Sequence, residues 1–193
     1  PIKLHVPIVR GDLTEARPTL KDAKSELEEQ VEAEGQQQNV EIIESEDGLT
    51  IRIKDNAVFS SGDAEIKRNI LPLLNKIGGV LARLPNTIEI GGHTDDLPIQ
   101  NDKFPNNHWL SSARALGVLD VFQNEVGIAA ERMTAIGHGE FKPIVDNDTG
   151  ENRALNRRVE IKVRHNQQSE ESSPGLVRQL LREADIDVEG EEE

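Results

Sequence analysis

The chain of 193 residues contains no cysteine, so neither a disulfide framework nor a cysteine-based metal site is predicted. It also lacks an apolar run of the roughly 20 residues that a membrane-spanning helix needs, or of the about 7–15 that a secretory signal needs. The sequence begins at Pro1 without a start methionine, which predicts a processed or truncated product. The absence of cysteine is compatible with both the cytosol and the periplasm.

Bases are scarce relative to acids, 22 against 36, and the formal net charge is −14. Nucleic acid and anionic lipid are therefore unfavourable partners. The negative charge lies in two flanks, residues 12–46 (net −8) and 166–193 (net −7), while residues 47–165 carry a net charge of −1. A chain of this length can bury a core, and we expect one compact domain with extensions. The expected division is a linker with a helix over 1–39, a folded domain over 40–165 and a flexible acidic tail over 166–193.

The linker helix is expected over residues 18–34, with Pro18 at its first position and Gly35 at its stop. Its apolar residues recur at three- and four-residue steps and form a narrow stripe; they are Leu20, Ala23, Leu27 and Val31. Such a stripe has two interpretations. The helix packs on the domain, or it pairs with a copy of itself as in a coiled coil.

Alternating and helical patterns then predict the elements of the domain. A hairpin is expected over 40–45 and 49–54 around Glu46-Asp47-Gly48, followed by a helix from Ser60 or Ser61 to Leu84 with a kink or interruption at Pro72 and Gly78-Gly79, a strand over 86–95, a helix over 107–126, a strand over 133–136 and a last antiparallel strand over 157–164. This order predicts an α+β fold, a two-layer sandwich with a mixed sheet and helices on one face. In the tail, Leu176, Val177, Leu180 and Leu181 suggest a short amphipathic helix.

Two charged residues are candidates for ligand binding. Asp95 follows a strand at its carboxyl end, and Arg114 shares a helix face with Leu110 and Ser111. A carboxylate and a guanidinium held apart can bind the ammonium and the carboxylate of a zwitterion. Spacing alone leaves open the alternative that Asp95 and Arg114 pair with each other.

Three further positions carry weaker expectations. Asn107 is either the helix cap or a ligand contact. Arg157 is in phase with the inward residues of the last strand and is either a structural clamp or a second carboxylate partner, whereas Arg158 points outward. His93 is expected to have a satisfied hydrogen-bonding role in the core, and His138 to lie in a loop. The histidines suggest no metal site, and no nucleophile with a base is evident.

Three motifs of the sequence, taken together, resemble the OmpA-like peptidoglycan-binding domain over about Val40 to His165. They are Gly92-His93-Thr94-Asp95, the run N-x-x-L-S-x-x-R-A-x-x-V from Asn107 to Val118, and Asn156-Arg157-Arg158-Val159-Glu160. The resemblance implies that Asp95 and Arg114 hold the diaminopimelate of the peptidoglycan stem peptide, without a cofactor, a metal or catalysis. The binding site that we expect consists of Asp95, Arg114, Thr94, Asn107, Leu110 and Arg157.

Within this family, Pro98 and the long loop to Trp109 are similar to the B subunits of flagellar stators, the MotB/PomB group. That likeness implies a periplasmic domain that anchors the motor to the wall, with a membrane helix upstream that is absent here. It also implies a homodimer, a stator A subunit and flagellar ring proteins as partners, and a linker helix that rearranges. The alternatives are an outer-membrane or lipoprotein-type wall tether and, in a different class, a wall-cutting enzyme.

Overall fold

The computed structural model describes residues 18–99 and 101–165. Its elements are α1 (Leu20–Ala33), β1 (Val40–Ser45), β2 (Gly48–Lys54), α2 (Asp55–Val58), α3 (Leu71–Ala82), β3 (Ile88–His93), α4 (Asn107–Val121), a π-helical turn (Phe122–Val126), a 3-10 turn (Ala130–Arg132), β4 (Met133–Gly137), α5 (Gly150–Asn156) and β5 (Arg158–Arg164). The predicted tail and its short helix lie outside the described residues.

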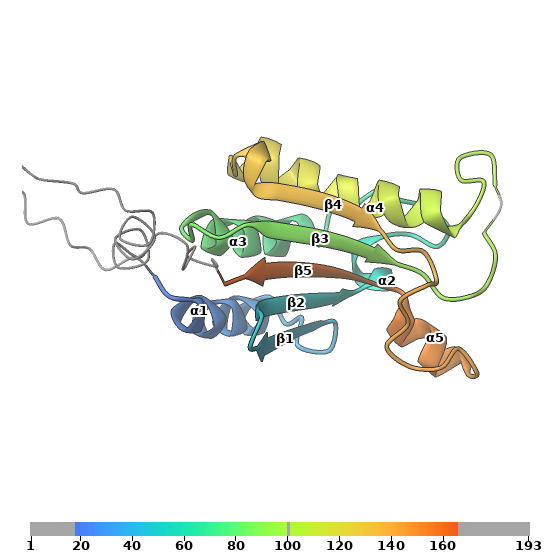
Figure 1. Ribbon diagram of the computed structural model, residues 1–193, viewed down its shortest axis with the longest axis horizontal. Coiled ribbons are helices and arrows are strands. Elements are labelled where there is room, and N and C mark those ends of the chain that lie inside the picture. Colours follow the sequence, from blue (N-terminus) through green and yellow to red (C-terminus); the bar gives the residue numbers. More distant parts are fainter. Residues whose placement is uncertain (1–17, 100, 166–193) are drawn as a thin grey trace, which may run out of the picture.

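The five strands form one mixed sheet in the order β1-β2-β5-β3-β4 (Figure 1). Strand β5 lies at the centre and runs antiparallel to both β2 and β3, whereas β3 and β4 are parallel. The predicted hairpin of β1 and β2 is present, with Ser45 opposite Gly48. The last strand of the chain is thus inserted between elements that precede it, which brings its first residues next to the ends of two other strands.

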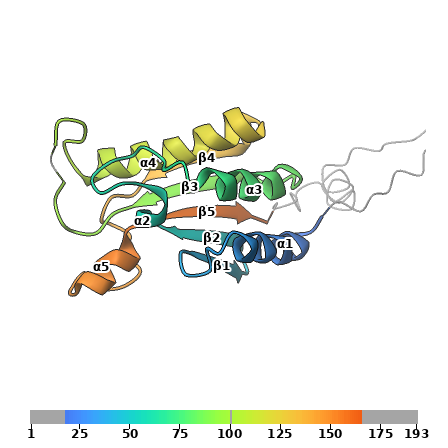
Figure 2. The same cartoon turned by 180° about the vertical axis from the view of Figure 1, so that it is seen from behind.

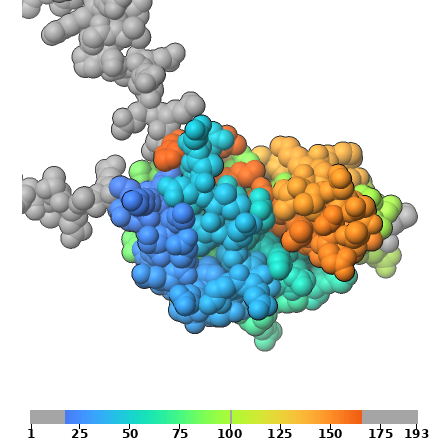
Figure 3. All heavy atoms as spheres, turned by 90° about the horizontal axis from the view of Figure 1, so that it is seen from below, coloured from blue at the N-terminus to red at the C-terminus, as the bar shows by residue number. Residues whose placement is uncertain are grey.

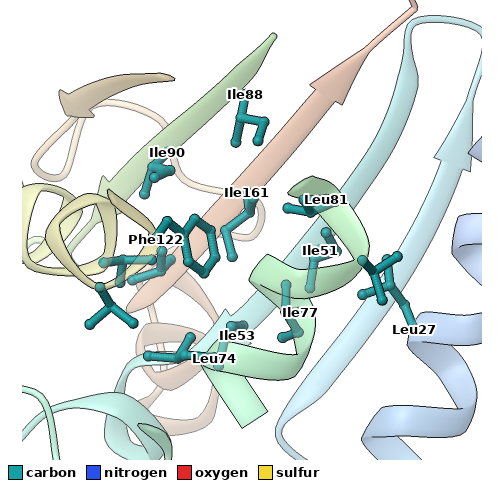
Figure 4. Packing of buried hydrophobic residues seen from close by; sticks show 14 of the residues in the cluster. Leu27, Ile51, Ile53, Leu74, Ile77, Leu81, Ile88, Ile90, Phe122 and Ile161 are labelled. Carbon is teal, nitrogen blue, oxygen red and sulfur yellow. The ribbon is translucent and has the colours of Figure 1, made fainter. Parts of the chain in front are cut away.

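Helices α1, α3 and α4 cover one face of the sheet (Figure 2), so the predicted two-layer α+β architecture is confirmed. Alternate residues of β2 and β5, such as Ile51 and Ile161, point into this layer because successive side chains of a strand face opposite ways. They pack against Leu74 and Ile77 of α3 and against Phe122 (Figure 4). Full burial of such a side chain stabilises the fold by about 1.5–3 kcal/mol.

Helix α1 begins two residues later than predicted, at Leu20 instead of Pro18. Thr19 is the cap, in a reciprocal capping box with Asp22, so Pro18 precedes the helix instead of beginning it. The apolar stripe, represented by Leu27, is buried in the common core, and α1 packs on α3. Ion pairs such as Lys76–Glu34 also join the two helices. The interpretation that the helix packs on its own domain is confirmed.

The predicted long helix from Ser60 to Leu84 is wrong in its first half. Only α3 is helical, and Pro72 lies in its first turn, where a missing N–H costs no hydrogen bond. No interruption occurs at Gly78-Gly79. A Cβ on Gly78 would lie 2.7 Å from Val126 and 3.0 Å from Phe122, so this glycine allows the turn after α4 to approach α3. Because it is not helical, the segment before α3 can line the site that is described below.

Helix α4 occupies the predicted range and ends in the π-helical turn. It packs closely on β3 because Gly92 has no side chain: a Cβ there would lie 2.1 Å from the Ser111 oxygen. The short helix α5 was not predicted. It belongs to the segment between β4 and β5, which lies beside the β1–β2 hairpin on the outer face of the sheet (Figure 3).

Candidate ligand-binding groove

Strand ends meet at one end of the sheet and position the candidate residues (Figure 1). Because β5 is antiparallel to its neighbours, Arg158 is paired both with Lys54 at the end of β2 and with His93 at the end of β3. The residues just beyond these pairs, Asp55 and Arg157, therefore lie side by side, and the Asp55 N–H donates to the Arg157 carbonyl at 3.1 Å.

A groove of about 480 Å³ opens at this end of the sheet, beside the start of α4. All six residues of the predicted site line it: Thr94, Asp95, Asn107, Leu110, Arg114 and Arg157. The structure adds Asp55, Phe59 and Lys67, among others. Its ionisable side chains, hereafter the groove cluster, are Asp55, Lys67, Asp95, Arg114 and Arg157. Ser111, which lies on α4 with Leu110 and Arg114, does not line the groove, and its Oγ accepts from the Gly139 N–H at 2.9 Å. The predicted common surface with Leu110 and Arg114 is therefore only partly present.

Asp95 is 6% exposed and is held from two sides. Its Oδ2 accepts from Nη1 of Arg157 at 2.5 Å, and its Oδ1 accepts from the Leu97 N–H at 3.2 Å. The neighbouring Thr94 N–H donates to the Gly139 carbonyl at 3.0 Å, which fixes the chain as it leaves β3. The alternative in which Asp95 pairs with Arg114 is therefore wrong, and Arg157 is its partner.

Arg114 is 3% exposed and contacts Asp55, with 2.8 Å between Nη1 and Oδ1. The N–H bond is not aimed at this oxygen, so Oδ1 of Asp55 is buried without a hydrogen-bond donor among the described residues. The Nε of Arg114 donates to the Asp63 carbonyl at 2.9 Å, and its guanidinium lies 5.1 Å from the centre of the Phe59 ring. Arg114 is thus anchored on the segment between α2 and α3, which the sequence predicted to be helical.

Asp55 was missed as a site residue. It carried a signal, because it directly follows an alternating strand just as Asp95 follows β3. Burial raises the pKa of Asp55, although the positive charges of Arg114 and Arg157 oppose this shift. Burial likewise lowers the pKa of Arg114. Both effects are those of a buried ion pair whose charges are incompletely compensated by hydrogen bonds.

Asn107 is not the helix cap. Asn106 is, because its side chain accepts from the Trp109 N–H. The amide of Asn107 instead donates to the carbonyls of Asp95 and Leu97 and accepts from the Ile99 N–H. This side chain therefore fixes the loop that follows Asp95 along the groove.

Residues 97–99 and 101–104, hereafter the strap, cross towards the segment before α3. The amide of Asn101 donates to the Gly62 carbonyl at 3.1 Å, and Lys103 pairs with Asp63 at 3.0 Å. Leu97, Pro98 and Ile99 line the groove. The strap thus supplies apolar side chains to the lining of the groove.

His93 is buried as expected, but its predicted hydrogen bonds are absent: neither ring nitrogen has a partner among the described residues. Burial and the positive charge of Arg158 lower its pKa to about 3. Its ring lies 4.7 Å from that of His138. Within 18–99 and 101–165, no three His, Asp or Glu side chains are grouped as metal ligands.

Together the fold and the groove define the class, an α+β domain with an ion-lined groove at one end of its sheet. None of the helices in the described part of the chain is long and apolar enough to cross a membrane. The chain belongs to the OmpA family, whose sequence model matches residues 58–157. The match includes Asp95, Arg114 and Arg157, and Asp55 lies just before it.

The chain is similar to Motility protein B of Bacillus subtilis, with 36% identity over 145 residues that cover 75% of this chain and 56% of that protein. It thus spans about half the length of the curated relatives it matches. It resembles the structure of a putative MotB like protein from Desulfovibrio vulgaris, with a TM-score of 0.69, 28% identity and coverage of 76% and 94% of the two chains. It also resembles the cell wall anchor of the T6SS from Pseudomonas aeruginosa, with a TM-score of 0.66, 32% identity and coverage of 77% and 98%.

Proposed function

We propose that this domain binds peptidoglycan non-covalently and anchors a flagellar motor stator to the cell wall. The observation that carries the proposal is the meeting of Asp95 and Arg114 in one groove, in a chain whose relatives include Motility protein B and a cell wall anchor. The groove offers both charges that a zwitterionic ligand requires.

The proposed ligand is the diaminopimelate of the stem peptide. Its ammonium binds Asp95, and its carboxylate binds the guanidinium of Arg114. Arg157 pairs with Asp95, so the ligand ammonium shares Asp95 with Arg157 or displaces Arg157 from it. This exchange is feasible because the Arg157 side chain is 37% exposed.

Arg114 needs a free donor to bind the ligand carboxylate. Its Nη2 contacts the Ser60 carbonyl at 3.5 Å, the longest of its contacts, and its Nη1 is not aligned on Asp55, so both terminal nitrogens have donors available to the ligand. Arg157 supplies a second, more exposed guanidinium to the same carboxylate. Thr94, Asn107 and Leu110 shape the groove around them.

We place the domain in the periplasm, as part of a longer protein that a helix upstream anchors in the inner membrane. A stator A subunit, flagellar ring proteins and a second copy of the chain are its proposed partners. Because the stripe of α1 is buried in the core of a single chain, a dimer that used this stripe would require α1 to leave α3. Sedimentation of the chain at high concentration tests the dimer.

Co-sedimentation with purified diaminopimelate-type peptidoglycan tests the binding. We expect Asp95→Asn to weaken binding at least about tenfold, because a charge-assisted contact to the ammonium is lost. Asp96→Asn is the matched control: it removes the same charge from the next residue, which is exposed and does not line the groove. Equal binding by the wild type and Asp95→Asn, with both folded, would reject the site.

A wall tether of the outer membrane or of a lipoprotein would use the same groove. Loss of motility on replacing chromosomal Asp95 by Asn, with an intact outer membrane, favours the stator; a leaky envelope in motile cells favours the tether. Release of muropeptides from peptidoglycan by the purified chain would instead demonstrate an enzyme.

A further inference from the structure

Lys67 gives the groove an excess of positive charge. Three cations, Lys67, Arg114 and Arg157, face two carboxylates, Asp55 and Asp95. This excess occurs in a chain whose net charge is −14. A zwitterion with one ammonium and one carboxylate would leave the excess unchanged. The groove is therefore better matched to a ligand with a net negative charge.

The ammonium of Lys67 has unused donors. The two arginines have carboxylate partners, at 2.8 Å for Arg114 and 2.5 Å for Arg157. No carboxylate of the described residues lies within 4.0 Å of the Lys67 ammonium, whose contact is the Asn56 carbonyl at 2.7 Å. A lysine ammonium has three N–H donors. Two of them are thus available to a ligand.

The backbone holds Lys67 at a fixed position beside the groove. Its N–H donates to the Val58 carbonyl at 2.8 Å, and the preceding Ile66 is bridged to Phe59, the residue whose ring lies under Arg114. Its ammonium contacts the carbonyl of Asn56, the residue after Asp55, at 2.7 Å, and its positive charge lowers the pKa of Asp55 against the effect of burial. Lys67 therefore lies on the Asp55 side of the groove.

We propose that Lys67 is a second anion subsite of the groove and binds another carboxylate of the peptide whose zwitterionic end is held by Asp95 and Arg114. The inference rests on the proposed function. Two carboxylates of a stem peptide have the required chemistry: the free α-carboxylate of its γ-linked glutamate and the carboxylate at its C-terminus. Binding should therefore depend on whether these other carboxylates of the peptide are free or amidated.

Calorimetric titration of the whole chain with three synthetic tetrapeptides tests the subsite. The first is L-Ala-γ-D-Glu-meso-diaminopimelate-D-Ala, the second has isoglutamine in place of glutamate, and the third has a C-terminal amide. We expect the wild type to bind one of the two amidated peptides about five- to tenfold more weakly than the first, as for loss of one partly exposed ion pair. Which peptide is weaker identifies the carboxylate.

Lys67→Met keeps the alkyl stem and removes the charge. We expect Lys67→Met to bind the first tetrapeptide as weakly as the wild type binds whichever amidated peptide it binds more weakly. The variant should therefore no longer distinguish that amidated peptide from the first tetrapeptide. Lys67→Arg should restore the distinction. Lys54→Met is the control, because Lys54 is an exposed lysine next to Asp55 that does not line the groove. Its preference should equal that of the wild type.

Two results would overturn the inference. One is that Lys67→Met keeps the wild-type preference among the peptides. The other is that Lys67→Met binds all three peptides more weakly by the same factor, which would indicate a long-range electrostatic effect without contact. Failure of the proposed function has a different signature. In that case the wild type binds none of the tetrapeptides, and Asp95→Asn changes nothing.

Discussion

Two consecutive arginines, one directly before β5 and one at its first position, belong to two different clusters of charged residues. Arg157 contributes to the groove cluster, whereas Arg158 lies on the opposite face of the sheet in a cluster that we call the outer-face cluster. The members of the outer-face cluster are Arg52, His93, Arg158, Glu160 and Lys162. Because side chains alternate along a strand, one step in sequence separates the two environments.

In the outer-face cluster, nearby cations fully compensate the negative charge of the central carboxylate, Glu160. Glu160 is 4% exposed and lies 2.8 Å from Arg158, 3.0 Å from Lys162 and 3.3 Å from Arg52. Burial alone would raise the pKa of Glu160, but its bonds to Arg158 and Lys162 outweigh this effect and lower the pKa to about 2. Arg158 also donates to the carbonyls of Asn156 and Lys142.

The groove cluster lacks this compensation. Oδ1 of Asp55 has no aligned donor, burial raises the pKa of that carboxyl, and Lys67 has no carboxylate partner in the described part of the chain. Buried polar atoms are normally hydrogen-bonded. The ring nitrogens of His93 in the outer-face cluster are unpaired as well, but that ring is neutral, whereas Asp55 is an acid in contact with the guanidinium of Arg114. The comparison teaches that the outer-face cluster supports the fold, whereas the groove cluster retains capacity for a ligand.

The sharpest way to break this comparison is to remove each arginine in turn. We expect Arg158→Met to lower the free energy of unfolding by about 3 kcal/mol or more, because it leaves Glu160 buried without its closest partner. Arg157→Met should cost less, about 1–2 kcal/mol, because the Arg157 side chain itself is 37% exposed although the buried Asp95 loses its ion-pair partner, and it should weaken peptidoglycan binding. Urea unfolding and co-sedimentation measure the two effects. Equal destabilisation by both variants would contradict the division.

Acid should destabilise the protein through His93. The folded state keeps its ring neutral with a pKa of about 3, while the unfolded chain protonates it near 6.5. The unfolded state therefore binds more protons, and this contribution is complete above pH 6.5 and is lost as the pH falls towards 3. Between pH 7 and pH 5 the loss is about 2 kcal/mol.

Urea unfolding at the two pH values measures this loss. His93→Leu should remove it, and His165→Gln, at an exposed position, should leave it unchanged. The groups that face His93 are Arg158, Glu160, Lys162 and His138. If His93→Leu retained the full difference between pH 7 and pH 5, another group would be responsible.

Sequence patterns predicted the sheet side of this molecule well and the groove side less well. The strands follow from alternation, and α1 and α4 from periodic apolar residues, because the core itself imposes these patterns. The helix predicted from Ser60 is absent before Leu71, because the backbone of this segment accepts a hydrogen bond from Arg114 instead of forming a helix. Such contacts are non-local and leave no period in the sequence.

The candidate site shows the same limit. Asp95 and Arg114 were identified from motif and position, and both line the groove. Arg157 was identified too, but not as the partner of Asp95, and Asp55 was missed because it is 59 residues from Arg114 in the chain and only the strand order brings it near. The burial of Arg158 was equally hidden: it points outward as predicted, but the segment with Lys142 covers it.

The smallest expected effect concerns the strap, which lies at the edge of the groove cluster. Lys103 pairs with Asp63, and their side chains are 64% and 29% exposed. We expect Lys103→Met to change the free energy of unfolding by less than about 0.5 kcal/mol and peptidoglycan binding by about twofold, because Asp63 also accepts from Arg114 through its carbonyl.

Lys24→Met is the matched control for the strap, because it breaks an exposed pair with Glu44 that is remote from the groove. It should alter stability by a similar amount and leave binding unchanged. Urea unfolding and co-sedimentation again supply both measurements. A tenfold loss of binding in Lys103→Met would show that the strap itself contacts the ligand, and the groove cluster would then have to be extended to include it.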